Sequence, residues 1–162
     1  MSAVLRDVLP YITFHVEPLS EFKREAAILF PKHWDEVALH KDTIKLDVDF
    51  NQFDILEASG SLHIVVARDA GRIIGYWIGI IRPHLHYKQS LTAYTDIFYV
   101  RQESRKDVFL FQHMLAFVEK TLKKRGVQKL FIASKVHKDL SKIFERLGMT
   151  RTEVVYTKLL ED

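Results

Sequence analysis

The chain has 162 residues, of which 48% are hydrophobic and 28% are charged, and its net charge is +3. This length and composition predict one globular domain over residues 1–162, and the absence of cysteine excludes disulfides, thiolate metal sites and a thiol nucleophile. No apolar run approaches the roughly 18 residues of a membrane span, and the first residues lack the apolar run of a signal peptide, so we expect a cytoplasmic protein without membrane contact.

Positive charge is concentrated in one stretch of the chain. Residues 101–142 hold eleven Lys or Arg side chains and only four Asp or Glu side chains. Such an imbalance favours an anionic ligand, either nucleotide-like or a nucleic acid. The alternative is that these side chains form ordinary solvated faces of helices and loops.

The first third of the chain is typical of one strand followed by helices. Residues 11–16 alternate and are rich in residues that favour strands. Ser20 is expected to cap a helix over residues 21–30, which ends at Pro31 because proline disrupts a helix interior. Further helical pieces are expected over residues 33–41 and 49–59.

The remaining two thirds predict most of the sheet. The expected elements are three strands, a helix, a strand, a helix and a final strand, over residues 62–68, 73–81, 91–100, 108–122, 129–133, 139–147 and 152–160. The first three strands follow one another directly and are expected to pair antiparallel. A helix joins the next strand to them, which predicts a parallel pair. The fold class is therefore α/β (α+β), with a mixed, mostly antiparallel central sheet of about six strands flanked by helices.

The junction after Val100 is the most informative motif. A strand ends there, a charged turn follows, and a long amphipathic helix begins. A strand that feeds directly into a helix presents backbone N–H groups to a phosphate. A phosphate-bearing ligand is the first hypothesis for this chain.

The order of elements and the residues around this junction resemble the GCN5-related N-acetyltransferase (GNAT) superfamily over nearly the whole chain. Val100 and Arg105 stand at the spacing of the family's pyrophosphate loop, whereas Val108 and Leu110 occupy its two small-residue positions. Residues 143–149, IFERLGM, are similar to the family's LYEKLGF run, with Phe144 in the place of a Tyr that often serves as general acid.

The resemblance implies a single acetyltransferase domain that uses acetyl-CoA as co-substrate. It assigns cofactor contacts to the end of the strand, to the turn and helix start, and to a residue after the next strand, namely Phe98, Tyr99, Val100, Arg105, Lys106, Asp107, Val108, Phe109, Leu110 and His137. The missing small residues and the carboxylate of Asp107 predict weaker cofactor binding than is usual for this fold.

Two residues are expected to carry the proton transfers. Strand alternation predicts that Tyr94, Asp96, Phe98 and Val100 share one face of the sheet. Asp96 lies four residues before the terminal Val, where the family often has a catalytic residue, and is the candidate general base. The alternative is a carboxylate satisfied by neighbouring N–H groups or an Arg. Tyr156 on the expected last strand is the candidate general acid, or else a buried strand tyrosine.

The acceptor amine is expected to meet residues from two segments. Trp34 and Glu36 could recognise a cationic amine by ring face and charge, and the resemblance places their segment in the acceptor wall. His84 and His86 are expected beside them, and Tyr94 is a further substrate-binding candidate. The alternatives are an ordinary acidic helix start at 33–36 and a two-histidine zinc site. No third zinc ligand is near in sequence, so no metal is assigned.

The function that follows is direct transfer of an acetyl group from acetyl-CoA to an amine of a small molecule or a protein, in a ternary complex. One alternative is a non-catalytic GNAT-fold accessory protein that has lost CoA binding. Another is a nucleic-acid-binding module that uses the basic residues 120–142. A homodimer is left open.

Overall fold

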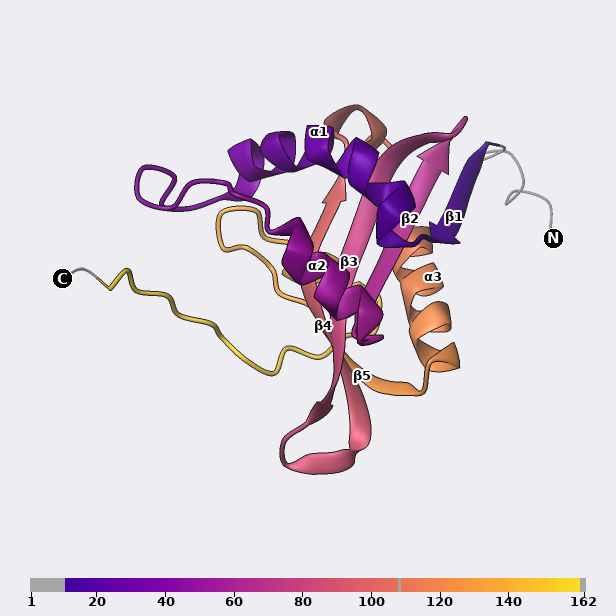
Figure 1. Ribbon diagram of the computed structural model, residues 1–162, viewed down its shortest axis with the longest axis vertical. Helices are drawn as coiled ribbons and strands as arrows, with labels where there is room; N and C mark the ends of the chain where they lie inside the picture. The colour runs from indigo at the N-terminus through magenta and orange to yellow at the C-terminus, as the bar shows by residue number, and fades with distance from the viewer. Residues whose placement is uncertain (1–10, 108, 161–162) are drawn as a thin grey trace.

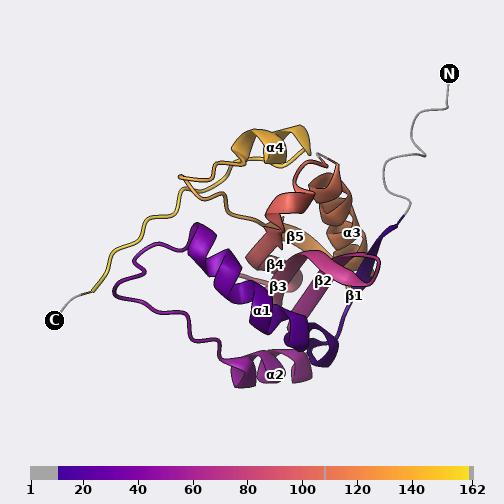
Figure 2. The same cartoon turned by 90° about the horizontal axis from the view of Figure 1, so that it is seen from above.

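The computed structural model describes residues 11–107 and 109–160, which form a five-stranded sheet with helices on both faces (Figure 1). The strands are β1 (Ile12–Val16), β2 (Leu62–Asp69), β3 (Arg72–His84), β4 (Tyr87–Val100) and β5 (Val127–Phe131). The helices are α1 (Leu19–Val37), α2 (Phe50–Ala58), α3 (Leu110–Lys124) and α4 (Ser141–Arg146), and a 3-10 turn covers Gln102–Ser104. From above, α1 and α2 lie on one side of the sheet and α3 lies on the other (Figure 2).

The sheet is mixed, as the sequence predicts. Its strand order is β1-β2-β3-β4-β5, with antiparallel pairs up to β4 and a parallel pair between β4 and β5. The parallel pairing covers only Leu91 to Tyr94 of β4. In the described part of the chain, β4 therefore continues from Thr95 to Val100 without a strand partner on the β5 side.

Two apolar cores hold the helices on the sheet. Phe22 and Leu29 of α1 pack with Tyr76 and Ile78 of β3 on one face. Met114 and other residues of α3 pack with the opposite face of the same strands. Burial of each large apolar side chain stabilises the fold by roughly 1.5–3 kcal/mol, so the helices are held firmly on both faces of the sheet.

Helix α1 continues through Pro31, so the predicted helix end at this residue is wrong. The buried positions of α1 run on in one stripe from Phe22 through Phe30 to His33, and this packing extends past the proline. Pro31 and Ala27 both face solvent. The carbonyl group of Ala27, which loses its helical hydrogen bond to residue 31, is therefore on the side where water can replace that bond.

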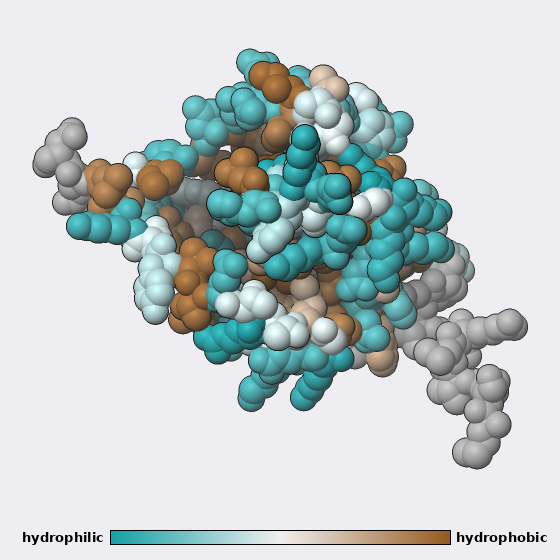
Figure 3. Space-filling model, turned by 90° about the horizontal axis from the view of Figure 1, so that it is seen from below, coloured by the Kyte–Doolittle hydropathy of each residue, from teal (hydrophilic) through white to brown (hydrophobic). Residues whose placement is uncertain are grey.

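The last predicted strand is also wrong. Residues 152–160 form no strand, and the sheet has five strands rather than about six. Val155 and Leu160 are 81% and 91% exposed, and apolar side chains are visible beside the C-terminal end of the described chain (Figure 3). Alternating β-forming residues favour an extended segment, but a strand also needs an edge with which to pair, and this segment pairs with none in the described chain.

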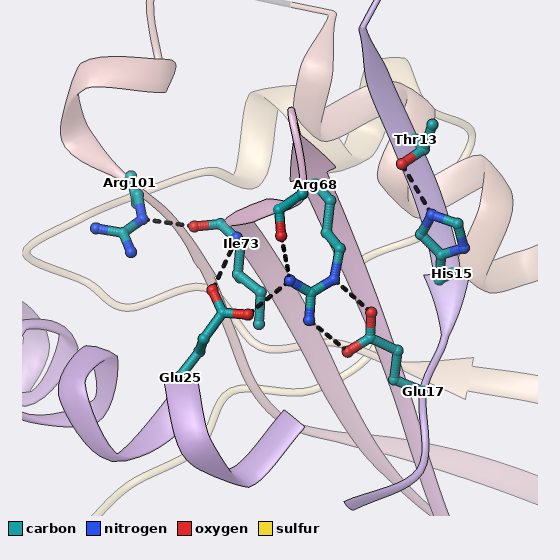
Figure 4. A network of polar contacts seen from close by, with 8 residues as sticks. Thr13, His15, Glu17, Glu25, Arg68, Ile73 and Arg101 are labelled. Carbon is teal, nitrogen blue, oxygen red and sulfur yellow. Dashed lines mark hydrogen bonds and ion pairs between the residues drawn. The ribbon is translucent and has the colours of Figure 1, made fainter. Parts of the chain in front are cut away.

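A polar network around Arg68 ties α1 to the sheet near the end of β4 (Figure 4). The Arg68 guanidinium donates to both carboxylate oxygens of Glu17, at 2.6 and 2.9 Å, and to Glu25 at 2.6 Å. Glu25 accepts from the backbone N–H of Ile73, whose carbonyl accepts from Arg101 at 2.6 Å. Because Arg101 directly follows β4, the network fixes the start of the turn that leads to α3.

Candidate active site

A pocket of about 710 Å³ lies where β4 continues beyond its pairing with β5. Its walls come from three parts of the chain: α1 with the segment that leads to α2, the last six residues of β4, and the residues that begin α3 or follow β5. Unpaired strand edges carry free backbone N–H and C=O groups. The pocket thus combines apolar side chains with hydrogen-bonding groups of the β4 backbone.

A β-bulge in β4 decides which side chains face which way. Ile78 pairs with Ile97, but the next residue of β3, Gly79, pairs with Thr95, so Asp96 has no opposite residue. An extra residue reverses the alternation of side chains on the far side of the bulge. The bulge also bends the strand where it leaves β5.

The predicted sharing of one face by Tyr94, Asp96, Phe98 and Val100 is therefore wrong. Phe98 and Val100 pack against the core on the α3 face. The guanidinium of Arg82 lies over the ring of Tyr94. Ile81 faces α3, so its neighbour Arg82 faces the opposite side of the sheet, and Tyr94 lies on that side as well. Tyr94 also stacks on Phe131 and does not line the pocket.

Asp96 lies at the bulge and lines the pocket, as a candidate base must. The residue is exposed to solvent, but the surrounding protein removes part of the hydration of its carboxylate. This desolvation raises the pKa of Asp96 above the ordinary value for an aspartate. A carboxylate with a raised pKa accepts a proton more readily near neutral pH.

Arg105 and Glu36, which the sequence assigns to different ligands, are paired with each other. The Arg105 guanidinium donates to both carboxylate oxygens of Glu36, at 2.5 and 2.8 Å, and its Nε donates to the carbonyl of Val100 at 2.9 Å. Lys138 Nζ lies 3.9 Å from Glu36. The hydrogen bond from Arg105 holds the pKa of Glu36 below its usual range, so this ion pair persists at neutral pH.

The carboxylate of Asp107 lies at the start of α3, where the sequence predicts a phosphate site. The carboxylate of Asp107 accepts from the backbone N–H of Phe109 at 2.9 Å, so one of the amides predicted to hold a phosphate is occupied. Asp107 and Leu110 line the pocket, whereas Lys106 and Phe109 are exposed beside it. Val108 lies outside the described residues.

Nine of the predicted site residues line this single pocket: Trp34, Glu36, Asp96, Phe98, Tyr99, Val100, Arg105, Asp107 and Leu110. His137 is exposed and does not line it, although its neighbours Lys135 and Lys138 do. Tyr156, the predicted general acid, is 89% exposed in the C-terminal segment and is also absent from the pocket wall. The reason is the missing last strand, which would have placed Tyr156 in the sheet.

The predicted grouping of His84 and His86 with Trp34 and Glu36 is wrong. The two histidines lie in the β3–β4 hairpin with ring centroids 5.7 Å apart, and the hairpin projects at the opposite end of the molecule from α1 (Figure 1). Strands β3 and β4 run beyond the predicted ends at residues 81 and 91 and carry the hairpin away. Within residues 11–107 and 109–160, no three His, Cys, Asp or Glu side chains are grouped as a metal site.

His33 is a pocket residue that the sequence reading does not single out. It is buried, its Nδ1 is 2.8 Å from the hydroxyl of Tyr76, and its ring stacks on Tyr99 with a centroid separation of 4.9 Å. Burial lowers the pKa of His33 to about 4, so the imidazole is neutral at pH 7. The stripe of buried residues that passes Pro31 is the signal that could have placed it.

Comparisons with known proteins identify the fold. No protein-family model matches the sequence, and no curated protein matches it. Among solved structures, the chain is similar to a ribosomal-protein-alanine N-acetyltransferase from Brucella melitensis biovar Abortus 2308, with 18% identity, 93% of this chain and 99% of that chain covered, and a TM-score of 0.72. It is also similar to glucosamine-6-phosphate N-acetyltransferase from Arabidopsis thaliana, with 16% identity, 93% and 99% covered, and a TM-score of 0.69.

A third similar structure is a predicted acetyltransferase with acetyl-CoA from Clostridium acetobutylicum, with 16% identity, 92% and 96% covered, and a TM-score of 0.66. The chain thus has the GNAT fold, and these structural neighbours are acetyltransferases. Among the described residues, every helix is too short or too polar to cross a membrane.

Proposed function

We propose that this protein is an N-acyltransferase that moves an acetyl group from acetyl-CoA to an amine in a ternary complex. The observation that carries the proposal is the pocket at the divergence of β4 and β5, with Asp96 on the bulge between an apolar wall and three cationic side chains. Acetyltransferases with the same fold support it.

The donor set of the pocket fits a phosphate-bearing thioester. Arg105, Lys135 and Lys138 supply positive charge on the side formed by the start of α3 and the residues after β5. Bound acetyl-CoA would supply an activated acyl group and a thiolate leaving group. The unpaired edge of β4 offers backbone groups that can orient the thioester and polarise its carbonyl.

Asp96 is proposed to take the proton that the amine loses as it attacks. The amine nitrogen forms a bond to the acyl carbon, the carbon–sulfur bond breaks, and the thiolate leaves with its electron pair. The thiolate takes up a proton from solvent water, and Asp96 later returns its proton to the solvent. Because the chain has no cysteine, the acyl group passes directly to the amine rather than through a thioester on the protein. The residue near position 144 offers no acid, since Phe144 is buried against Phe98 and Phe111.

One observation favours a second candidate, a non-catalytic protein with this fold. Glu36 occupies the guanidinium of Arg105, and Asp107 occupies the N–H of Phe109. Both groups are those that a pyrophosphate would use. If these internal contacts are stronger than the ligand's, the pocket stays without cofactor.

Binding and turnover separate the two candidates. We expect acetyl-CoA to raise the melting temperature of the protein, since a ligand at a hundredfold excess over its Kd adds about 2.7 kcal/mol of stability. Asp96→Asn should lower turnover about 100-fold or more with acetyl-CoA affinity unchanged, whereas Asp54→Asn on the exposed face of α2 should change neither. No melting shift at millimolar acetyl-CoA refutes the acetyltransferase proposal. Full turnover in Asp96→Asn keeps that proposal and refutes only the assignment of Asp96 as the base.

A further inference from the structure

The pocket has two chemically different walls. All three Lys or Arg side chains that line it, Arg105, Lys135 and Lys138, come from the start of α3 or the residues after β5. The wall formed by α1, α2 and the segment between them contains no Lys or Arg. Its side chains are largely apolar, with Phe30, Trp34, Val37, Leu46, Val48 and Phe53 among them.

The two groups on this wall that could attract a cation already have cations from the chain itself. The carboxylate of Glu36 is paired with Arg105 at 2.5 Å. The ring of Trp34 has Lys41 Nζ above it, 5.2 Å from the centroid. His33 is neutral at pH 7 and its Nδ1 is used by Tyr76. A polycationic acceptor therefore finds no unpaired carboxylate among the described residues of this wall, and Asp96 on β4 is assigned to the reacting amine alone.

We infer that the acceptor is an amine carried on an apolar body, aromatic or branched aliphatic, rather than a polyamine or an amino sugar. This inference rests on the proposed function, because the phosphate-bearing co-substrate is assigned to the cationic wall and the acceptor to the apolar one. Burial of an apolar body against Phe53, Val48 and Ile97 would supply most of the affinity.

The test compares 2-phenylethylamine with spermidine and glucosamine. We expect kcat/KM to be at least tenfold higher for 2-phenylethylamine. Val48→Asp should reduce that value at least tenfold with acetyl-CoA binding unchanged, whereas Ile44→Asp, in the same segment but outside the pocket wall, should not. A preference for spermidine or glucosamine, or an unaffected Val48→Asp variant, overturns the inference.

Failure of the proposed function has a different signature. If acetyl-CoA does not bind, the amines are tested alone by tryptophan fluorescence. Binding of 2-phenylethylamine that Val48→Asp weakens then supports an apolar-amine site without catalysis. No binding, or equal binding of spermidine, overturns the inference.

Discussion

If Arg105 binds a phosphate of acetyl-CoA as proposed, Glu36 must compete with that phosphate, and Glu36→Gln tests this directly. Both carboxylate oxygens of Glu36 accept from the guanidinium, while the Nε of Arg105 is held by the carbonyl of Val100. A phosphate that uses the same two nitrogens must break the pair. Glutamine has nearly the same shape and removes the negative charge, so it leaves Arg105 available.

The magnitude follows from the exposure of the pair. The side chains of Arg105 and Glu36 are 39% and 22% exposed, so solvent screens the pair and its worth falls near the upper end of the range for surface ion pairs, about 1 kcal/mol. In Glu36→Gln the ligand no longer has to break this pair, so acetyl-CoA should bind with about a fivefold lower Kd. Arg105→Ala should have the opposite effect, because it removes the donor itself.

Calorimetric titration with acetyl-CoA at low salt measures the effect. The matched control is Glu21→Gln, which removes the same charge from the exposed first turn of the same helix. The control should change Kd less than twofold. An equal or weaker affinity in Glu36→Gln than in the control would falsify the idea that Glu36 blocks the anion site.

Three further predictions concern groups near the sheet. Asp107→Asn keeps an oxygen for the N–H of Phe109 but removes the charge, so it should tighten acetyl-CoA binding by a few-fold in the same titration. Burial and Arg125 lower the pKa of His63 to about 4, so at this residue only the unfolded chain takes up a proton as pH falls from 7 to 5. His63 should therefore account for a loss of about 2 kcal/mol of stability in denaturant unfolding, in addition to a similar loss from His33, and His63→Gln should remove the His63 part. Gly79→Ala should destabilise by about 1–3 kcal/mol in the same assay, because its Cβ would lie 2.0 Å from the ring of Trp77.

The sheet order was predictable because it follows from local patterns. Three adjacent strands and a helical crossover require antiparallel neighbours and then a parallel pair, and β4 and β5 have that arrangement. The course of α1 was not predictable from Pro31 alone. The decisive fact is that Phe30 and His33 share a buried stripe across the proline, which a rule for single residues does not weigh.

The sequence predicted which residues of β4 and its turn belong to the candidate site, but it did not predict the directions of their side chains. Asp96 and Arg105 were expected at the end of β4 and its turn, and both line the pocket. The bulge at Asp96 depends on the partner strand, where the ring of Trp77 covers Gly79 and donates to Thr95 at 3.0 Å. No pattern within residues 94–100 contains that information, so the side-chain directions were predicted incorrectly.

The pairing of Glu36 with Arg105 has the same origin. The two residues are 69 positions apart, and only the packing of α1 over the end of β4 brings them together. A sequence pattern can assign a charge to a wall of the pocket. It cannot show that a second charge from a distant segment already satisfies it.

The three acids of the pocket are therefore distinguished by their partners rather than by their residue type. Glu36 is held ionised by Arg105, and Asp107 is hydrogen bonded to the N–H at the start of α3. Asp96 has neither an arginine nor a helix terminus, and desolvation raises its pKa. A general base must be free to accept a proton, and a raised pKa favours that role. Among these three acids, only Asp96 has its pKa shifted in this direction. If Asp96 is the base, Glu36→Gln and Asp107→Asn should change cofactor affinity, while the dependence of turnover on pH should stay that of the unmodified protein.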